Sequence, residues 1–178
     1  ERITALLALD SLIPDAIDSA SVVDQLRKHI RDYRRRGRSA PGYAAPNVAI
    51  DALIKKTGMS PQAAECLVQR GLVSDESGDN SEGLWRWRSD PRVLSASALK
   101  FTAEQWETIF HSIRCPVFLL TASGGMARHP EFLKRWVACF ERIEHESIEG
   151  SHHCHMDPGT VSDVARRVAE FCKKIELK

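Results

Sequence analysis

The sequence, 178 residues long, lacks the features that mark membrane-spanning and nucleic-acid-binding proteins. No apolar run approaches the roughly 20 residues that a membrane-spanning helix needs, and no charged-then-apolar signal segment opens the chain. Its charges nearly cancel, because 25 Lys and Arg stand against 24 Asp and Glu, which leaves a formal charge of +1. This balance gives no reason to expect nucleic acid or an acidic membrane surface as a partner.

Cysteine is scarce and shows no pairing pattern. The chain has five cysteines, an odd number, widely spaced and without a C-x-x-C pair. This spacing argues against both a disulfide framework and a zinc ribbon. We therefore expect reduced thiols in a cytoplasmic protein, and we expect no cofactor.

Two apolar runs have the length of a β-strand: I-T-A-L-L-A-L-D at residues 3–10 and P-V-F-L-L-T-A at residues 116–122. Continuous runs of this kind are typical of strands buried on both faces of a parallel sheet. A weaker alternating run at residues 142–148 indicates an edge strand. Helical periodicity at residues 130–140 and from about residue 158 onward alternates with the last two strands, which predicts an α/β fold.

The two runs divide the chain. We expect a sheet strand at residues 1–14, a helical insertion at residues 15–112, and the remaining strands and helices at residues 113–178. The stretch from Ser21 to Ser112 is expected to be all helical, apart from a short extended segment where Trp85 and Trp87 alternate with arginines. Because a buried first strand needs neighbours and the chain begins with Glu1, we interpret it as a fragment of a longer protein.

Two residues with proton-transfer chemistry follow strands. Asp10 directly follows the first strand, and His152 follows the last one in the segment E-G-S-H-H-C-H-M-D-P. Catalytic groups of parallel sheets gather outside the carboxyl ends of the strands, so these two should lie at one edge. A carboxylate bonded to one imidazole nitrogen fixes the tautomer and leaves the other nitrogen free as a general base.

The same segment raises a metal-site alternative, because three histidines and a cysteine stand in four consecutive positions. Adjacent residues rarely supply several ligands to one ion, since tetrahedral geometry favours wider spacings. We therefore expect no metal site here. His153, Cys154 and His155 are expected to be structural.

The order of these features resembles the C-terminal part of an α/β-hydrolase: L-A-L-D-S-L-I-P, a helical insertion, a strand after Arg-Cys-Pro, and G-S-H-H-C-H-M-D-P before a final helix. The segments L-V-Q-R-G-L, W-R-W-R-S-D-P-R and G-S-H-H-C-H-M are most similar to the serine hydrolase-like branch. This resemblance implies that His152 is the catalytic histidine and that the insertion is a cap. Many members carry the acid after the strand at residues 116–122, where this chain has no carboxylate before Glu131. Asp10 is therefore the expected orienting acid, with a purely structural carboxylate as the alternative.

The family's nucleophile belongs to a G-x-S-x-G elbow, which this chain does not contain. The nearest serines, Ser11 and Ser123, lack the flanking glycines. The resemblance thus implies a nucleophile upstream of Glu1, with the upstream half of the same fold as partner, and the chain should be inactive alone.

The expected function is hydrolysis of a small-molecule substrate at an ester-like or otherwise activated carbon centre. A non-catalytic interaction protein on the same fold, or less favourably a metal-binding loop protein, is the alternative. Four aromatic residues are candidates for substrate binding, although plain packing is the favoured explanation for each. These are Trp85, Trp87, Phe101 and Trp106.

Overall fold

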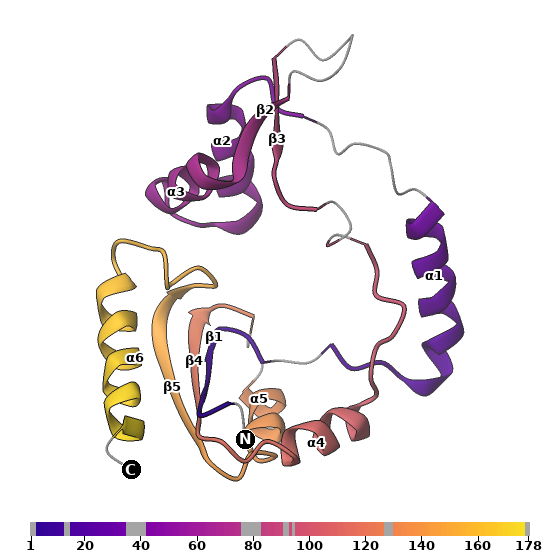
Figure 1. Ribbon diagram of the computed structural model, residues 1–178, viewed down its shortest axis with the longest axis vertical. Coiled ribbons are helices and arrows are strands. Elements are labelled where there is room, and N and C mark those ends of the chain that lie inside the picture. Colours follow the sequence, from indigo (N-terminus) through magenta and orange to yellow (C-terminus); the bar gives the residue numbers. More distant parts are fainter. Residues whose placement is uncertain are drawn as a thin grey trace. The chain divides into compact units, whose positions relative to one another are not determined.

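The computed structural model describes residues 3–12, 15–34, 42–75, 83–90, 93, 95–126 and 130–176. The chain forms two compact units, one of Glu1–Ala16 with Phe101–Lys178 and the other of Ile17–Lys100. Figure 1 traces both units along the chain. In chain order the elements are β1 (Leu6–Leu9), a short 3₁₀ helix η1 (Ser19–Ser21), α1 (Val22–Arg34), α2 (Pro46–Thr57), α3 (Pro61–Gly71), β2 (Leu72–Asp75), β3 (Leu84–Trp87), α4 (Ala103–His111), β4 (Val117–Gly124), α5 (Pro130–Val137), β5 (Ile143–Ser151) and α6 (Val161–Glu176).

A parallel sheet in the order β1-β4-β5 organises the first unit. The apolar run predicted as a buried strand is β4, and every residue from its start to Ala122 is buried. The first run forms a shorter strand than expected. In the described sheet β1 pairs only with β4, and Leu7 is 39% exposed. Among the described strands, β4 is therefore the central one, and β5 lies at an edge as predicted.

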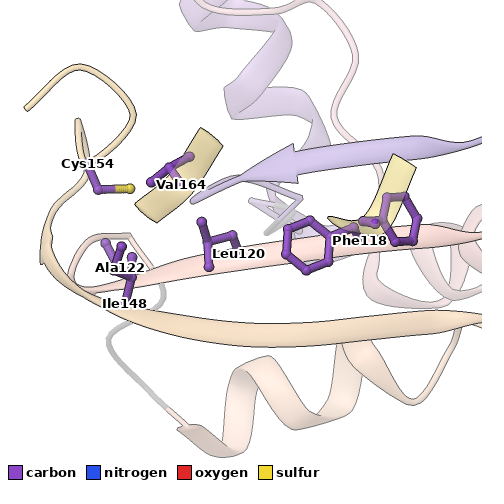
Figure 2. Close-up of a cluster of buried hydrophobic side chains, with 7 residues drawn as sticks. Phe118, Leu120, Ala122, Ile148, Cys154 and Val164 are labelled. Carbon is purple, nitrogen blue, oxygen red and sulfur yellow. The ribbon is translucent and has the colours of Figure 1, made fainter. Parts of the chain in front are cut away.

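Alternate residues of β4 fill two cores, because successive side chains of a strand point to opposite faces. On one face, Phe118, Leu120 and Ala122 pack with Ile148, Cys154 and residues of α6. Figure 2 shows this cluster, with Cys154 and Val164 near the ends of the strands. On the other face, Val117 packs with residues of α4, α5 and the turn after α5.

The helix α4 belongs to the sheet unit, which differs from the expected insertion at residues 15–112. Phe110 is 3% exposed and stacks on Phe140 with ring centroids 4.8 Å apart. A capping box starts the helix, since the Thr102 side chain and the Gln105 side chain bond each other's backbone N–H. Because the apolar face of α4 packs on the sheet, the inserted unit is Ile17–Lys100.

The inserted unit contains a strand, β2, that was not expected, so the expectation of helices outside the tryptophan segment is wrong at Leu72–Asp75. The extended segment expected at Trp85 and Trp87 is β3, which pairs antiparallel with β2. Helices α2 and α3 bury Ala49 and Val68 with Leu72, and both tryptophans pack against them. A sheet forms here because the half-buried indole rings need the pleated surface that a lone helix does not offer.

Candidate functional site

The site begins where β1 ends, at Asp10. The backbone N–H of Asp10 donates to the Leu120 carbonyl at 2.6 Å, which extends the β1–β4 pairing by one residue. Positive φ angles at Asp10 (45°) and Leu12 (68°) then bend the chain away from the strand direction. Such angles are uncommon for residues with a side chain and persist only where the surroundings hold them. The bend leaves the Asp10 side chain fully buried, with 0% exposure.

Among the described residues, three donors bond the Asp10 carboxylate. One oxygen, Oδ1, accepts from the Ala122 N–H at 2.9 Å. The other, Oδ2, accepts from the Met126 N–H at 2.9 Å and lies 2.6 Å from His152 Nδ1. A buried carboxylate needs such partners, because an unpaired one would lose its hydration without compensation.

Gly125 makes this arrangement sterically possible. A Cβ atom at this position would lie 2.2 Å from each carboxylate oxygen of Asp10. The turn after β4 therefore approaches the carboxylate with its bare backbone, and Gly125 itself closes the turn by donating to the Ala122 carbonyl at 2.9 Å. We call residues 122–126 the cradle of Asp10. The turn carries no acid of its own but supplies backbone donors to the acid of the neighbouring strand.

His152 follows the end of β5. Gly150 has φ 143°, a conformation that L side chains rarely adopt, and it redirects the chain just before His152. The turn that follows is fixed by the Cys154 N–H, which donates to the Ser151 carbonyl at 3.0 Å. The His152 side chain is 38% exposed, against 0% for Asp10.

The contact assigns the proton positions of His152. A carboxylate only accepts hydrogen bonds, so Nδ1 carries the proton that is shared with Asp10. In the neutral ring Nε2 then has a free lone pair. The arrangement can therefore accept a proton at Nε2 and stabilise the imidazolium that forms, which is the chemistry of a general base.

The neighbouring residues are more enclosed. Cys154 has 0% exposure, and burial, followed by the negative charge of Asp10, raises the pKa of its thiol. Burial also lowers the pKa of His153, an effect reinforced by the nearby His152 and His155 and opposed by Asp10. Within the described ranges, no group of three or more His, Cys, Asp or Glu side chains is placed to hold a metal ion.

The exposed and the buried cysteines are expected to differ in their rates of alkylation. Cys66 is exposed, whereas Cys139 and Cys154 are buried and burial raises the pKa of both thiols. Because the thiolate is the reactive form, iodoacetamide at neutral pH should modify Cys66 first and Cys154 only after denaturation. Peptide mass spectrometry of samples taken at successive times measures the alkylation of each cysteine. Equal labelling of Cys66 and Cys154 in the native protein would contradict the buried placement.

Stability is expected to fall on mild acidification. Burial lowers the pKa of His153 below its ordinary value of about 6.5, so near and just below that pH the unfolded chain binds more protons than the folded chain. The contribution of His153 to stability is complete above the pKa that it has in the unfolded chain, and it is lost as pH falls through its lower pKa in the folded chain. The urea midpoint should thus be lower at about pH 5.5 than at about pH 7.5, and this difference should be smaller in a His153→Gln variant. His111→Gln, on the exposed side of α4, is the control; an equally flattened pH dependence there would refute the assignment.

The four aromatic candidates lie in two different packing clusters. In the inserted unit, Trp85 exchanges two backbone hydrogen bonds with Tyr43, and Trp87 makes an edge contact with the Tyr43 ring. In the sheet unit, Phe101 and Trp106 meet edge to face with centroids 5.2 Å apart, and Trp106 packs on the α4–α5 core. Packing thus explains the contacts of all four, and their role in substrate binding stays a prediction.

The structure brings together Asp10 and His152, and it adds residues that sequence reasoning missed. Ala122, Gly125 and Met126 contribute through the backbone, which carries no sequence signature of its own. The one available signal was the pair of adjacent glycines in T-A-S-G-G-M. Consecutive glycines directly after a strand indicate a close backbone approach.

The chain is similar to known proteins in sequence and in structure. No protein-family model matches the chain. It is 26% identical to a serine hydrolase-like protein of Dictyostelium discoideum over 117 residues, which cover 62% of this chain and 32% of that protein. Among solved structures, a hypothetical protein of Pseudomonas aeruginosa PAO1 has 30% identity and a TM-score of 0.83, over 97% of this chain and 60% of that one.

A thioesterase domain from the curacin biosynthetic pathway has 20% identity and a TM-score of 0.69, over 99% of this chain and 59% of that one. The chain therefore spans less than two thirds of the length of each of these relatives. In the part of the chain that the structure describes, no helix has the length and apolar character to cross a membrane. The parallel sheet and its flanking helices match α/β-hydrolase structures, and the chain is thus related to the α/β-hydrolases and adopts part of their fold.

Proposed function

We propose that the protein is a hydrolase in which His152 is the general base and Asp10 the acid that orients it. The observation that supports it is the 2.6 Å contact between His152 Nδ1 and the Asp10 carboxylate, whose other partners among the described residues are backbone N–H groups. A buried, fully bonded carboxylate is a fixed acceptor, so the imidazole that bonds to it has one orientation and one tautomer. Relatives named as a serine hydrolase-like protein, a thioesterase domain and an esterase support this reading.

The reaction follows from this pair once a nucleophile is supplied. We place the nucleophile, a serine, in a segment outside these 178 residues. Its hydroxyl oxygen attacks an ester-like carbonyl while His152 Nε2 takes the hydroxyl proton, and the same imidazolium then protonates the leaving group. Water next attacks the acyl-serine and gives a proton to Nε2, and the imidazolium returns that proton to the serine oxygen as the bond to the acyl group breaks and the acid is released.

The inserted unit is proposed as the cap over the substrate. Its aromatic residues Trp85 and Trp87 remain candidates for substrate contacts, as do Phe101 and Trp106 of the sheet unit. No substrate beyond the ester-like class follows from the residues of this chain.

A covalent probe tests the proposal directly. A fluorophosphonate reacts with serines that a histidine activates, so the full-length protein should be labelled once, on a peptide outside this chain. The same label should form much more slowly in a His152→Ala variant of unchanged fold. Labelling at Ser11 or Ser123 would overturn the placement of the nucleophile. Absence of labelling together with absence of ester hydrolysis would favour a non-catalytic interaction protein.

A further inference from the structure

The ends of β4 and β5 are irregular beside the site. Ala122 pairs with Ile148 and Gly124 pairs with Ser151, so Ser123 alone opposes the two residues Glu149 and Gly150. This is the pattern of a β-bulge, which inserts one extra residue into one strand and re-aims the side chains that follow. Bulges are unusual between parallel strands and common next to active sites. Here the extra residue comes directly before Ser151 and His152.

The Ser123 hydroxyl fills the gap in the strand pairing. It donates to Glu149 Oε2 at 2.7 Å and accepts the Gly150 N–H at 3.3 Å. Both residues of the bulge are thus held by one side chain. A bulge leaves a backbone group without its ladder partner, and a hydroxyl can replace that partner because it both donates and accepts.

The backbone packing beneath the bulge leaves little room for movement. A Cβ atom at Gly124 would lie 2.9 Å from the Gly150 carbonyl oxygen, so the two strands touch at this point. Gly150 carries the φ of 143° that turns the chain toward His152. The N–H that Ser123 accepts therefore belongs to the residue that sets the direction of the His152 turn.

We infer that Ser123 is a positioning residue that fixes the His152 imidazole against Asp10 by clamping Glu149 and Gly150. The inference rests on the proposed function for its catalytic consequence, but its geometric content stands on the bulge alone. It gives Ser123 a role other than that of a nucleophile, because its hydroxyl proton is committed to the Glu149 carboxylate.

The test combines kinetics with a spectroscopic signature in the full-length protein. In Ser123→Ala, kcat for p-nitrophenyl butyrate should fall about tenfold with KM unchanged, since small misplacements of a catalytic group are costly. The downfield proton resonance of His152 Nδ1–H, which reports its short bond to Asp10, should broaden or move upfield. Ser123→Thr retains the hydroxyl and should restore both readouts.

Ser147→Ala is the matched control, because Ser147 is an exposed serine on β5, the strand that carries Glu149, outside the bulge. Wild-type kinetics and resonance in Ser123→Ala, or the same changes in Ser147→Ala, would overturn the inference. If the wild-type protein hydrolyses no ester, the proposed function fails while the resonance still decides the positioning role. If Ser123→Ala does not fold, Glu149→Ala removes one partner of the clamp, and an unchanged resonance there refutes it.

Discussion

Replacing Asp10 by asparagine in the full-length protein should reduce kcat for ester hydrolysis by about 10⁴-fold, the scale of loss when the orienting acid of a catalytic histidine is removed. Each partner of the carboxylate among the described residues is a donor: the N–H groups of Ala122 and Met126 and the Nδ1–H of His152. An asparagine amide has one accepting oxygen and one donating nitrogen. Whichever way it is oriented, its NH₂ group meets at least one N–H donor, and no negative charge remains to stabilise the imidazolium.

The two orientations of the amide share this consequence. With NH₂ toward Ala122, the His152 tautomer is kept but the charge is lost. With NH₂ toward His152, the ring must shift its proton to Nε2 and can no longer accept one there. The unsatisfied buried donor should also cost about 1–3 kcal/mol of folding free energy.

Steady-state kinetics and urea unfolding of Asp10→Asn measure both effects. Asp51→Asn, an exposed aspartate on α2, serves as the control and should match the wild-type protein. A kcat within threefold of wild type, with the variant folded, would show that Asp10 is the structural carboxylate of the alternative reading. A loss of stability without a loss of kcat would lead to the same conclusion.

Replacing Gly125 by alanine should lower the free energy of unfolding by about 3 kcal/mol, at the upper end of what overpacking and lost buried hydrogen bonds cost. The added Cβ would stand 2.2 Å from both oxygens of Asp10. Asp10 cannot retreat, because its side chain is fully buried and its N–H is bonded to the Leu120 carbonyl. The cradle must therefore open, which breaks the Met126 contact and displaces the carboxylate from His152.

Gly159→Ala is the matched control for this substitution. A Cβ at Gly159 meets no atom within 4 Å, so the variant should be as stable as the wild-type protein. Urea unfolding compares the midpoints at unchanged slope. A midpoint of Gly125→Ala close to that of Gly159→Ala would show that the turn accommodates a side chain and would remove the steric basis of the cradle.

Local patterns in the sequence predicted much of the sheet unit. The apolar run at residues 116–122 gave the central strand β4 because a strand covered on both faces needs a continuous apolar sequence. The strand predicted at residues 3–10 was too long, because only Leu6–Leu9 form β1. Its burial on both faces was also overestimated, since Leu7 remains 39% exposed. Apolar composition signals a strand, but it does not tell how many neighbours that strand has.

Position along the sheet, rather than composition, predicted the pairing of Asp10 with His152. Both follow parallel strands, and the carboxyl ends of parallel strands share an edge. The structure places the two side chains in contact although 142 positions separate them. Their catalytic role remains a prediction of the resemblance to the α/β-hydrolases.

The inserted unit shows where local patterns failed. The helices α2 and α3 agree with the expected helical stretch, and α2 ends at the left-handed Gly58. The strand β2 was missed because L-V-S-D has only four residues and follows the end of α3 at Gly71 directly. The boundary at residue 112 was misplaced because an amphipathic helix does not reveal which partner covers its apolar face.

By itself, the sequence determined which segments are strands of a parallel sheet, and that an aspartate and a histidine end two of them. Periodicity over a few residues carries that information, because each segment must match the faces it buries. Only the tertiary structure decided how the pair is held. The cradle joins Asp10 to backbone atoms at positions 122 and 126, and the Ser123 clamp joins two strand ends. Such contacts depend on the path of the chain between distant residues, and backbone donors look alike in every sequence.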